Sequence, residues 1–237
     1  MLSFGHSKGG KLARQMTRRF LAIGLIPLGL VTYVTYRYAE DALRREVTNG
    51  LFAIAKRQSN QIETYLRERE KDAAALARGF TIVAAAEQYD RAFRAGGPNS
   101  QEYLKVDSAF RPFITHLQQS FGYADLFLIS LEGNAIFSAQ RGKELGTNFR
   151  HGPFRNSELA KVFERAIMMM ATDLSDFARY APKDAPAAFI ATPVMRDRSL
   201  IGILALQMDN EAVYRVVNEY TGLGATGETI IGSRVGQ

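Results

Sequence analysis

Residues 189–208 read FIATPVMRDRSLIGILALQM, and this stretch decides the fold. It contains two apolar runs, Phe189–Val194 and Leu200–Met208, on either side of the polar turn Arg196-Asp197-Arg198. Short apolar runs that flank a polar turn are typical of two antiparallel strands. The stretch therefore predicts a pair of neighbouring strands in a sheet.

A second strand pair is expected upstream. The run Asp125–Ser130 (DLFLIS) is followed by Glu132-Gly133-Asn134 and then by Ala135–Ser138 (AIFS). Two β-like runs around a Gly-Asn turn predict a hairpin. Helices are expected at 102–121, 156–171 and 210–220, the second of them capped by Asn156 or Ser157. The element order predicts an α+β fold, in which helices flank an antiparallel, PAS-like sheet.

The region before the sheet predicts one long helix. From Ala39 to Tyr89 there is no proline, and apolar residues recur at helical spacing. Such a helix is longer than its own domain can cover, so we expect a stalk that packs against a second copy of the chain. The alternative is two ordinary helices separated near Gly50.

The N-terminal region predicts a membrane helix. Phe20–Tyr36 carries no charge and lies between Arg19 and Arg37, a length at the short end of what crosses a bilayer. The cations in front of it place the N-terminus in the cytoplasm by the positive-inside rule. The alternatives are a cleaved signal peptide, which needs a better cleavage site than VTYVTYRY, and a buried core helix.

The net charge of +6 belongs to this membrane border. No acidic residue precedes Glu40, and without the five cations of residues 8–19 the chain has 25 basic and 24 acidic residues. A phosphate-binding stripe is therefore not expected, and no nucleic acid is predicted as a partner. The chain has no cysteine, which excludes disulfides and thiolate chemistry.

No motif predicts catalysis or a cofactor. Residues 222–227 (GLGATG) match G-x-G-x-x-G, but they follow a helix and run into a strand, the reverse of the dinucleotide-binding context. We interpret them as a turn. His6, His116 and His151 are scattered, so neither a metal site nor a Ser-His-Asp arrangement is expected.

Several segments resemble the double Cache (dCache) sensor domains of bacterial chemoreceptors, sensor histidine kinases and nucleotide-cyclase receptors. They are DLFLISLEGNAIFSA, GTNFRHGPFRNSELAKVFERA, SDFARYAP, PAAFIATPV, IGILALQMD and TGLGATGETIIG, which cover most of residues 123–232. The resemblance implies a membrane-distal, PAS-like module that binds the ligand, followed by a membrane-proximal module and an output domain. The chain has no tryptophan, so the Arg-x-Trp-Tyr part of the family's amino-acid signature is missing.

The expected organisation follows the chain order. It comprises a cytoplasmic N-terminus (1–19), a transmembrane helix (20–38), a stalk helix (39–89), a Cache sensor module (90–221) and the start of a truncated membrane-proximal module (222–237). The protein is thus expected in the cell inner membrane, crossing it once, with its sensor in the periplasm.

The ligand site is expected between the sheet and the segments 148–154 and 176–181, on the side where the resemblance places the family's pocket. Asp176 is the candidate for binding an amine, and Tyr180 would add a hydroxyl and a ring face. His151 and Arg155 would suit a carboxylate. The remaining candidates are Phe127, Asn148, Phe154, Phe177 and Phe189. The alternative for 176–186 is a surface loop with incidental aromatic residues.

The predicted function is the sensing of a small molecule of unknown identity and charge by a dimeric transmembrane receptor. The alternatives are a membrane-anchored enzyme and a purely structural oligomerisation module. The sequence offers no convergent nucleophile and base, which argues against the enzyme.

Overall fold

The structure, a computed structural model, describes residues 9–209 and residue 211. Its contacts divide the chain into two compact units, Met1–Arg57 and Gln58–Gln237. The helix predicted at 210–220 is described only at residue 211. The glycine-rich turn at 222–227 and the start of a membrane-proximal module lie outside the described residues.

The first unit contains the N-terminal part of helix α1 (Gly9–Ala77). Large apolar side chains of its charge-free segment are exposed, Phe20 by 85% and Ile23 by 74%. By length and composition, the described part of the chain has one helix that is long and apolar enough to cross a membrane. It is this N-terminal helix.

The helix expected from Ala39 to Tyr89 is two helices. α1 ends at Ala77, and α2 (Phe80–Gly96) begins after Gly79, whose backbone is extended. The Gly79 N–H donates to the Leu76 carbonyl at 2.9 Å. This turn lets α2 bury its apolar face in the domain core, a requirement that the helical spacing alone does not reveal. The alternative break near Gly50 is wrong, because α1 runs through it.

The two helices predicted at 102–121 and 156–171 are confirmed as α3 (Gln101–Ser120) and α4 (Glu158–Met169). Each begins after a serine that caps it. The Ser100 hydroxyl accepts from the Tyr103 N–H, and the Ser157 hydroxyl accepts from the Ala160 N–H, both at 3.2 Å. These bonds satisfy backbone donors that have no partner within the helix.

The main sheet has five antiparallel strands in the order β2-β1-β7-β6-β3. Their bounds are β1 (Asp125–Ile129), β2 (Ala135–Ser138), β3 (Asp173–Leu174), β6 (Phe189–Arg196) and β7 (Ser199–Gln207). Both predicted strand pairs are confirmed, β1 with β2 and β6 with β7. Asp197 and Arg198 have positive φ angles of 47° and 69°, as the two central residues of a type I′ hairpin turn require.

The region at 176–186, for which a surface loop is the alternative interpretation of the sequence, contains two short strands. β4 (Ala178–Tyr180) and β5 (Ala185–Ala187) pair with each other in a separate, two-stranded sheet. Three residues per strand are too few for an alternating pattern to be visible in the sequence. Neither strand of this hairpin forms backbone hydrogen-bond pairs with the main sheet.

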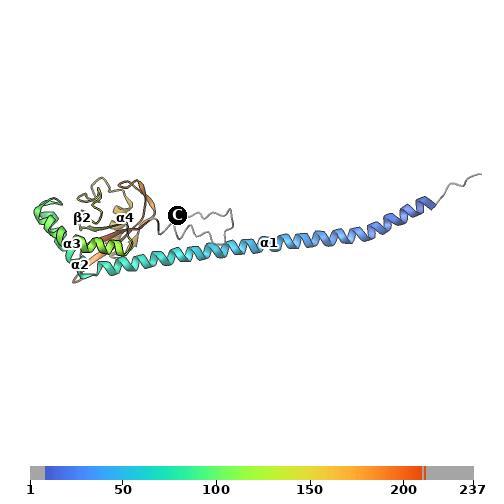
Figure 1. Ribbon diagram of the computed structural model, residues 1–237, viewed down its shortest axis with the longest axis horizontal. Coiled ribbons are helices and arrows are strands. Elements are labelled where there is room, and N and C mark those ends of the chain that lie inside the picture. The colour runs from blue at the N-terminus through green and yellow to red at the C-terminus, as the bar shows by residue number, and fades with distance from the viewer. Residues whose placement is uncertain (1–8, 210, 212–237) are drawn as a thin grey trace, which may run out of the picture. The chain divides into compact units, whose positions relative to one another are not determined.

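Alternating side chains give the main sheet two buried faces. Leu126, Leu128 and Leu204 face a core formed with α2 and α3. Phe127, Phe189 and Ile203 face a second core formed with α4. Figure 1 shows α2 and α3 on one side of the sheet and α4 on the other.

Candidate ligand-binding site

Three of the predicted site residues lie together in the core on the α4 side. Phe127 on β1 and Phe189 on β6 are fully buried on the same face of the sheet, on either side of β7, with ring centroids 6.4 Å apart. Tyr180, from the β4–β5 hairpin, packs edge-to-face on Phe189 at 4.8 Å. Phe154 packs against the same core and is partly exposed. The hairpin thus covers an aromatic floor provided by the main sheet.

A buried carboxylate lies under this hairpin. The Tyr180 hydroxyl donates a hydrogen bond of 2.6 Å to Oε1 of Glu144, whose exposed fraction is 0%. Burial, and then the bond to Glu144, raise the pKa of Tyr180 far above its usual value, so the hydroxyl acts as the donor. Oε2 of Glu144 has no hydrogen-bond partner among the described residues. A buried carboxylate oxygen without a donor is costly, and a ligand cation or N–H group would satisfy it.

Gly142 makes room for this carboxylate. A Cβ atom at position 142 would overlap Oε2 of Glu144. Any larger residue would displace the carboxylate, so the loop from 142 to 144 is shaped around the Tyr180–Glu144 pair.

A second buried carboxylate, Asp125, begins strand β1. It accepts hydrogen bonds from the Leu126 N–H at 2.7 Å, the Gln140 N–H at 3.1 Å and the Ser138 hydroxyl at 3.1 Å. Burial raises the pKa of Asp125 despite these donors and the positive charge of Lys183. Since two of these donors, the Ser138 hydroxyl and the Gln140 N–H, lie at or just after the end of β2, Asp125 holds that end in place.

Lys183 joins the hairpin to the main sheet. Its Nζ donates to Oε1 of Gln207, the last residue of β7, at 2.7 Å. Together with the Tyr180–Glu144 bond, this contact attaches β4 and β5 to the body of the domain without any strand ladder. The hairpin is therefore attached to this face by side chains and not by backbone pairing with the main sheet.

In the structure, the Asn148 side chain stabilises the turn at residues 148–151. Its Oδ1 accepts from the N–H groups of Arg150 at 2.8 Å and His151 at 3.0 Å, and its Nδ2 donates to Oδ1 of Asn134 at 2.9 Å. These bonds occupy both ends of the amide and tie the turn to the β1–β2 loop.

The other predicted residues are on the surface. His151, Arg155 and Asp176 are exposed, and the Phe177 side chain is 45% exposed. The structure does not bring them together with the buried Tyr180 hydroxyl. Asp176 lies between β3 and β4, where its carbonyl accepts from the Ser175 hydroxyl at 3.0 Å.

Sequence reasoning missed Glu144. It lies in the stretch RGKELGT, where nothing in the hydrophobic pattern distinguishes it from an exposed glutamate. Only the approach of Tyr180, 36 positions later, identifies it as part of a site. In the described part of the chain, no three His, Asp or Glu side chains gather where they could hold a metal ion.

Comparison with solved structures places this fold among bacterial sensor domains. The sensor domain of the histidine kinase DctB from V. cholerae has 18% identity and a TM-score of 0.55, over 76% of this chain and 60% of that one. The sensory domain of the Campylobacter jejuni chemoreceptor Tlp3 has 11% identity and a TM-score of 0.50, over 69% and 61%. The same domain in complex with L-norvaline has 12% identity and a TM-score of 0.50, over 69% and 59%.

The chain thus has the fold of the Cache-type sensor domains of receptors, as the sequence resemblance implied. It spans about three fifths of the length of the solved domains that it matches. These similar structures are sensor domains and not enzymes. No protein-family model and no curated protein matches the chain.

Proposed function

We propose that this protein is the ligand-sensing part of a transmembrane signalling receptor, with the sensor outside the inner membrane. The support is a sensor-domain fold together with an N-terminal helix that is apolar enough to span a bilayer. On this proposal, ligand binding shifts the chain between two arrangements, and α1 passes the change through the membrane to a chemoreceptor, kinase or cyclase output.

The proposed ligand site is the region under the β4–β5 hairpin. The observation that carries it is the buried Tyr180–Glu144 pair with its unpartnered carboxylate oxygen. Phe127, Phe189 and Tyr180 provide an apolar wall, and a few polar anchors on such a wall are typical of small-molecule sites. Asn148, His151, Phe154, Arg155, Asp176 and Phe177 complete the proposed rim.

The proposed ligand is a small molecule with an amino group. A protonated amine would donate to Oε2 of Glu144 and lie near the face of an aromatic ring, which also favours a cation. The complex of Tlp3 with L-norvaline, a ligand that carries an amino group, is consistent with this class. Asp176 remains the alternative anchor for the amine at the rim.

A binding experiment separates the two anchors. The full chain in lipid nanodiscs is screened by thermal shift against amino acids, simple amines and organic acids, and the best ligand is then measured by calorimetry. We expect Glu144→Gln to weaken binding of an amine ligand at least about tenfold, since a charge-assisted hydrogen bond is lost. Asp176→Asn should change the affinity less than about twofold.

Two outcomes would contradict this assignment. If Glu144→Gln binds as tightly as the original chain, Glu144 does not hold the amine. If only Asp176→Asn loses binding, the anchor is at the rim. Tyr180→Phe removes the donor to Glu144 and keeps the ring, so it reports on the positioning of the carboxylate.

A further inference from the structure

A second polar pocket lies on the opposite, α2–α3 side of the sheet. Its volume is about 620 Å³, and it is bounded by α3 and by the residues that follow β2. Leu104, Pro112 and Ala139 provide apolar walls, and Ser108 and Thr115 add hydroxyl groups. It shares no lining residue with the Tyr180–Glu144 region.

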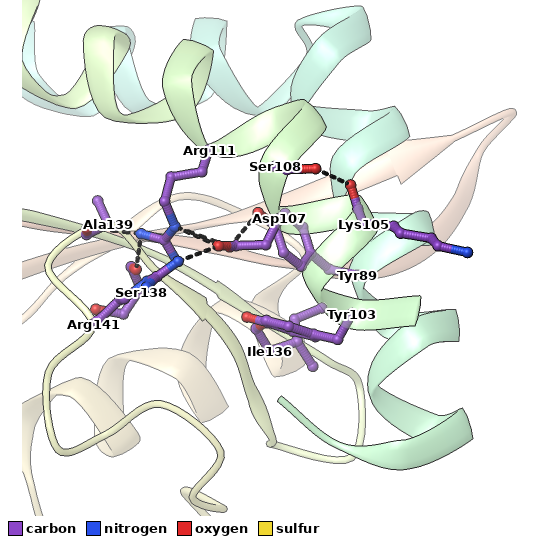
Figure 2. Close-up of polar contacts among 10 residues, drawn as sticks. All are labelled: Tyr89, Tyr103, Lys105, Asp107, Ser108, Arg111, Ile136, Ser138, Ala139 and Arg141. Carbon is purple, nitrogen blue, oxygen red and sulfur yellow. Dashed lines mark hydrogen bonds and ion pairs between the residues drawn. The ribbon is translucent and has the colours of Figure 1, made fainter. Parts of the chain in front are cut away.

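Two arginines and one aspartate provide the charge of this pocket (Figure 2). Nε of Arg111 donates to both carboxylate oxygens of Asp107, at 2.9 and 2.8 Å. Nη2 of Arg141 donates to Oδ2 of Asp107 at 2.5 Å, and the Tyr89 hydroxyl donates to Oδ1 at 2.9 Å. One carboxylate therefore balances two guanidinium groups, which leaves an excess positive charge.

The Arg111 guanidinium is fixed in place by its contacts with the protein. Nη1 donates to the carbonyls of Ser138 at 3.0 Å and Ala139 at 2.9 Å, and the group lies over the Phe137 ring, 4.6 Å from its centroid. Nη2 is buried and has no acceptor among the described residues. The Arg111 side chain is only 16% exposed, so the surrounding residues also restrict its aliphatic part.

The second arginine is free to adjust. The Arg141 side chain is 58% exposed and donates a side-chain hydrogen bond to the same Asp107 oxygen that Arg111 contacts. The Arg111 guanidinium is fixed, the Arg141 guanidinium can adjust, and the Asp107 carboxylate beside them is already fully hydrogen-bonded. This arrangement suits an incoming anion of low charge. A dianion would exceed the single excess charge of the pocket.

We infer that this pocket binds a small organic monocarboxylate through the exposed guanidinium of Arg141, beside the fixed positive charge of Arg111. The Arg141 guanidinium matches the planar carboxylate, and the walls formed by Leu104, Pro112 and Ala139 cover a short carbon chain. The sensor domain then has two ligand sites, one on each face of the sheet.

The two sites are joined through the end of β2. Arg111 holds the Ser138 carbonyl, and the Ser138 hydroxyl donates to Asp125 on the other side of the strand pair. These bonds, with the one from the Gly142 N–H to the Ser138 hydroxyl, attach Arg111 to the segment that follows β2.

The test uses the full chain in nanodiscs, in buffer without carboxylate or phosphate ions, with butyrate as the probe and butyramide as its uncharged counterpart. We expect calorimetry to detect butyrate binding and no butyramide binding. Arg141→Gln removes one donor, and Ser108→Leu fills the pocket while keeping every charge. Each should weaken butyrate binding at least about tenfold.

Matched controls separate this pocket from the first site. Arg67→Gln removes an exposed arginine on α1 outside both proposed sites, and Glu144→Gln alters the proposed amine site; both should keep butyrate affinity within about twofold. The inference is overturned if butyramide binds as well as butyrate or if no butyrate binding is detected. It is also overturned if either pocket variant retains full affinity, or if Glu144→Gln abolishes butyrate binding.

Discussion

At the scale of single residues, the domain is organised around buried carboxylates with different partners. Burial alone would raise the pKa of Asp107, but hydrogen bonds from Arg111, Tyr89 and Arg141 outweigh it, and the pKa lies below its usual value. Asp125 has only neutral hydrogen-bond donors, and burial raises its pKa. The first carboxylate is therefore stabilised as an ion, and the second is penalised as one.

The lowered pKa of Asp107 predicts a pH dependence. Because its folded-state pKa is below the unfolded value of about 4, its contribution is complete above that pH and is lost as the pH falls through the folded pKa. Asp107→Asn should lower the free energy of unfolding at pH 7 by about 3 kcal/mol, because Arg111 loses its buried counter-ion. Urea unfolding of the full chain at pH 3 to 7 measures both effects.

The control for Asp107 is an exposed pair on α1. Glu63 and Arg67 are each 64% exposed, so Glu63→Gln should change the stability by less than about 1 kcal/mol. Equal effects of the two substitutions, or an unchanged pH profile in Asp107→Asn, would show that Asp107 does not stabilise the fold as an ion.

At the scale of elements, α1 carries apolar side chains that its own unit leaves exposed. Leu43, Val47 and Leu51 follow one another at helical spacing, with exposed fractions of 63%, 52% and 49%. An exposed apolar stripe along a helix is a surface for a partner helix. We therefore propose that two copies of the chain pair along α1.

This pairing predicts a position-specific effect. Replacing Leu51, Ile54 and Ile62 with Asp should reduce chemical crosslinking between membrane-anchored chains by at least about half, because buried charges oppose helix pairing. The matched control places Asp at Ala53, Asn60 and Thr64, which lie on the opposite face of the helix by its 3.6-residue period. Equal crosslinking in the two triple variants would rule out this interface.

At the scale of the whole molecule, charge and hydropathy predict the membrane topology. Lys8, Lys11, Arg14, Arg18 and Arg19 precede the charge-free segment, and the rest of the chain is nearly neutral. The positive-inside rule then places residues 1–19 in the cytoplasm and residues 39–237 outside.

Reporter fusions measure this topology. A fusion at position 15 should be active only as a cytoplasmic reporter, and a fusion after residue 230 only as an external one. Replacing the five N-terminal cations with Gln should reduce the fraction of correctly oriented chains, because the charge asymmetry is lost. External activity of the fusion at position 15 would contradict the proposed orientation.

Local patterns in the sequence were sufficient to predict the main elements. Both strand pairs, the serine that caps α4 and the apolar N-terminal helix depend on neighbours within a few positions, through side-chain alternation, capping and hydropathy. The break at Gly79 was missed because it depends on where α2 must turn to reach the core. The short β4–β5 pair was missed because three residues carry no visible period.

The sequence by itself determined the fold class, the two main strand pairs, the helices α3 and α4 and the membrane-compatible helix, because these follow from the period and hydropathy of local segments. Only the tertiary structure identified Glu144 under Tyr180, and the pair of arginines around Asp107. Glu144 and Tyr180 are 36 positions apart, and Arg141 is 34 positions from Asp107, whereas Arg111 lies one helical turn from Asp107 on α3. Burial and hydrogen bonding depend on which segments meet in space, and no local pattern encodes that meeting.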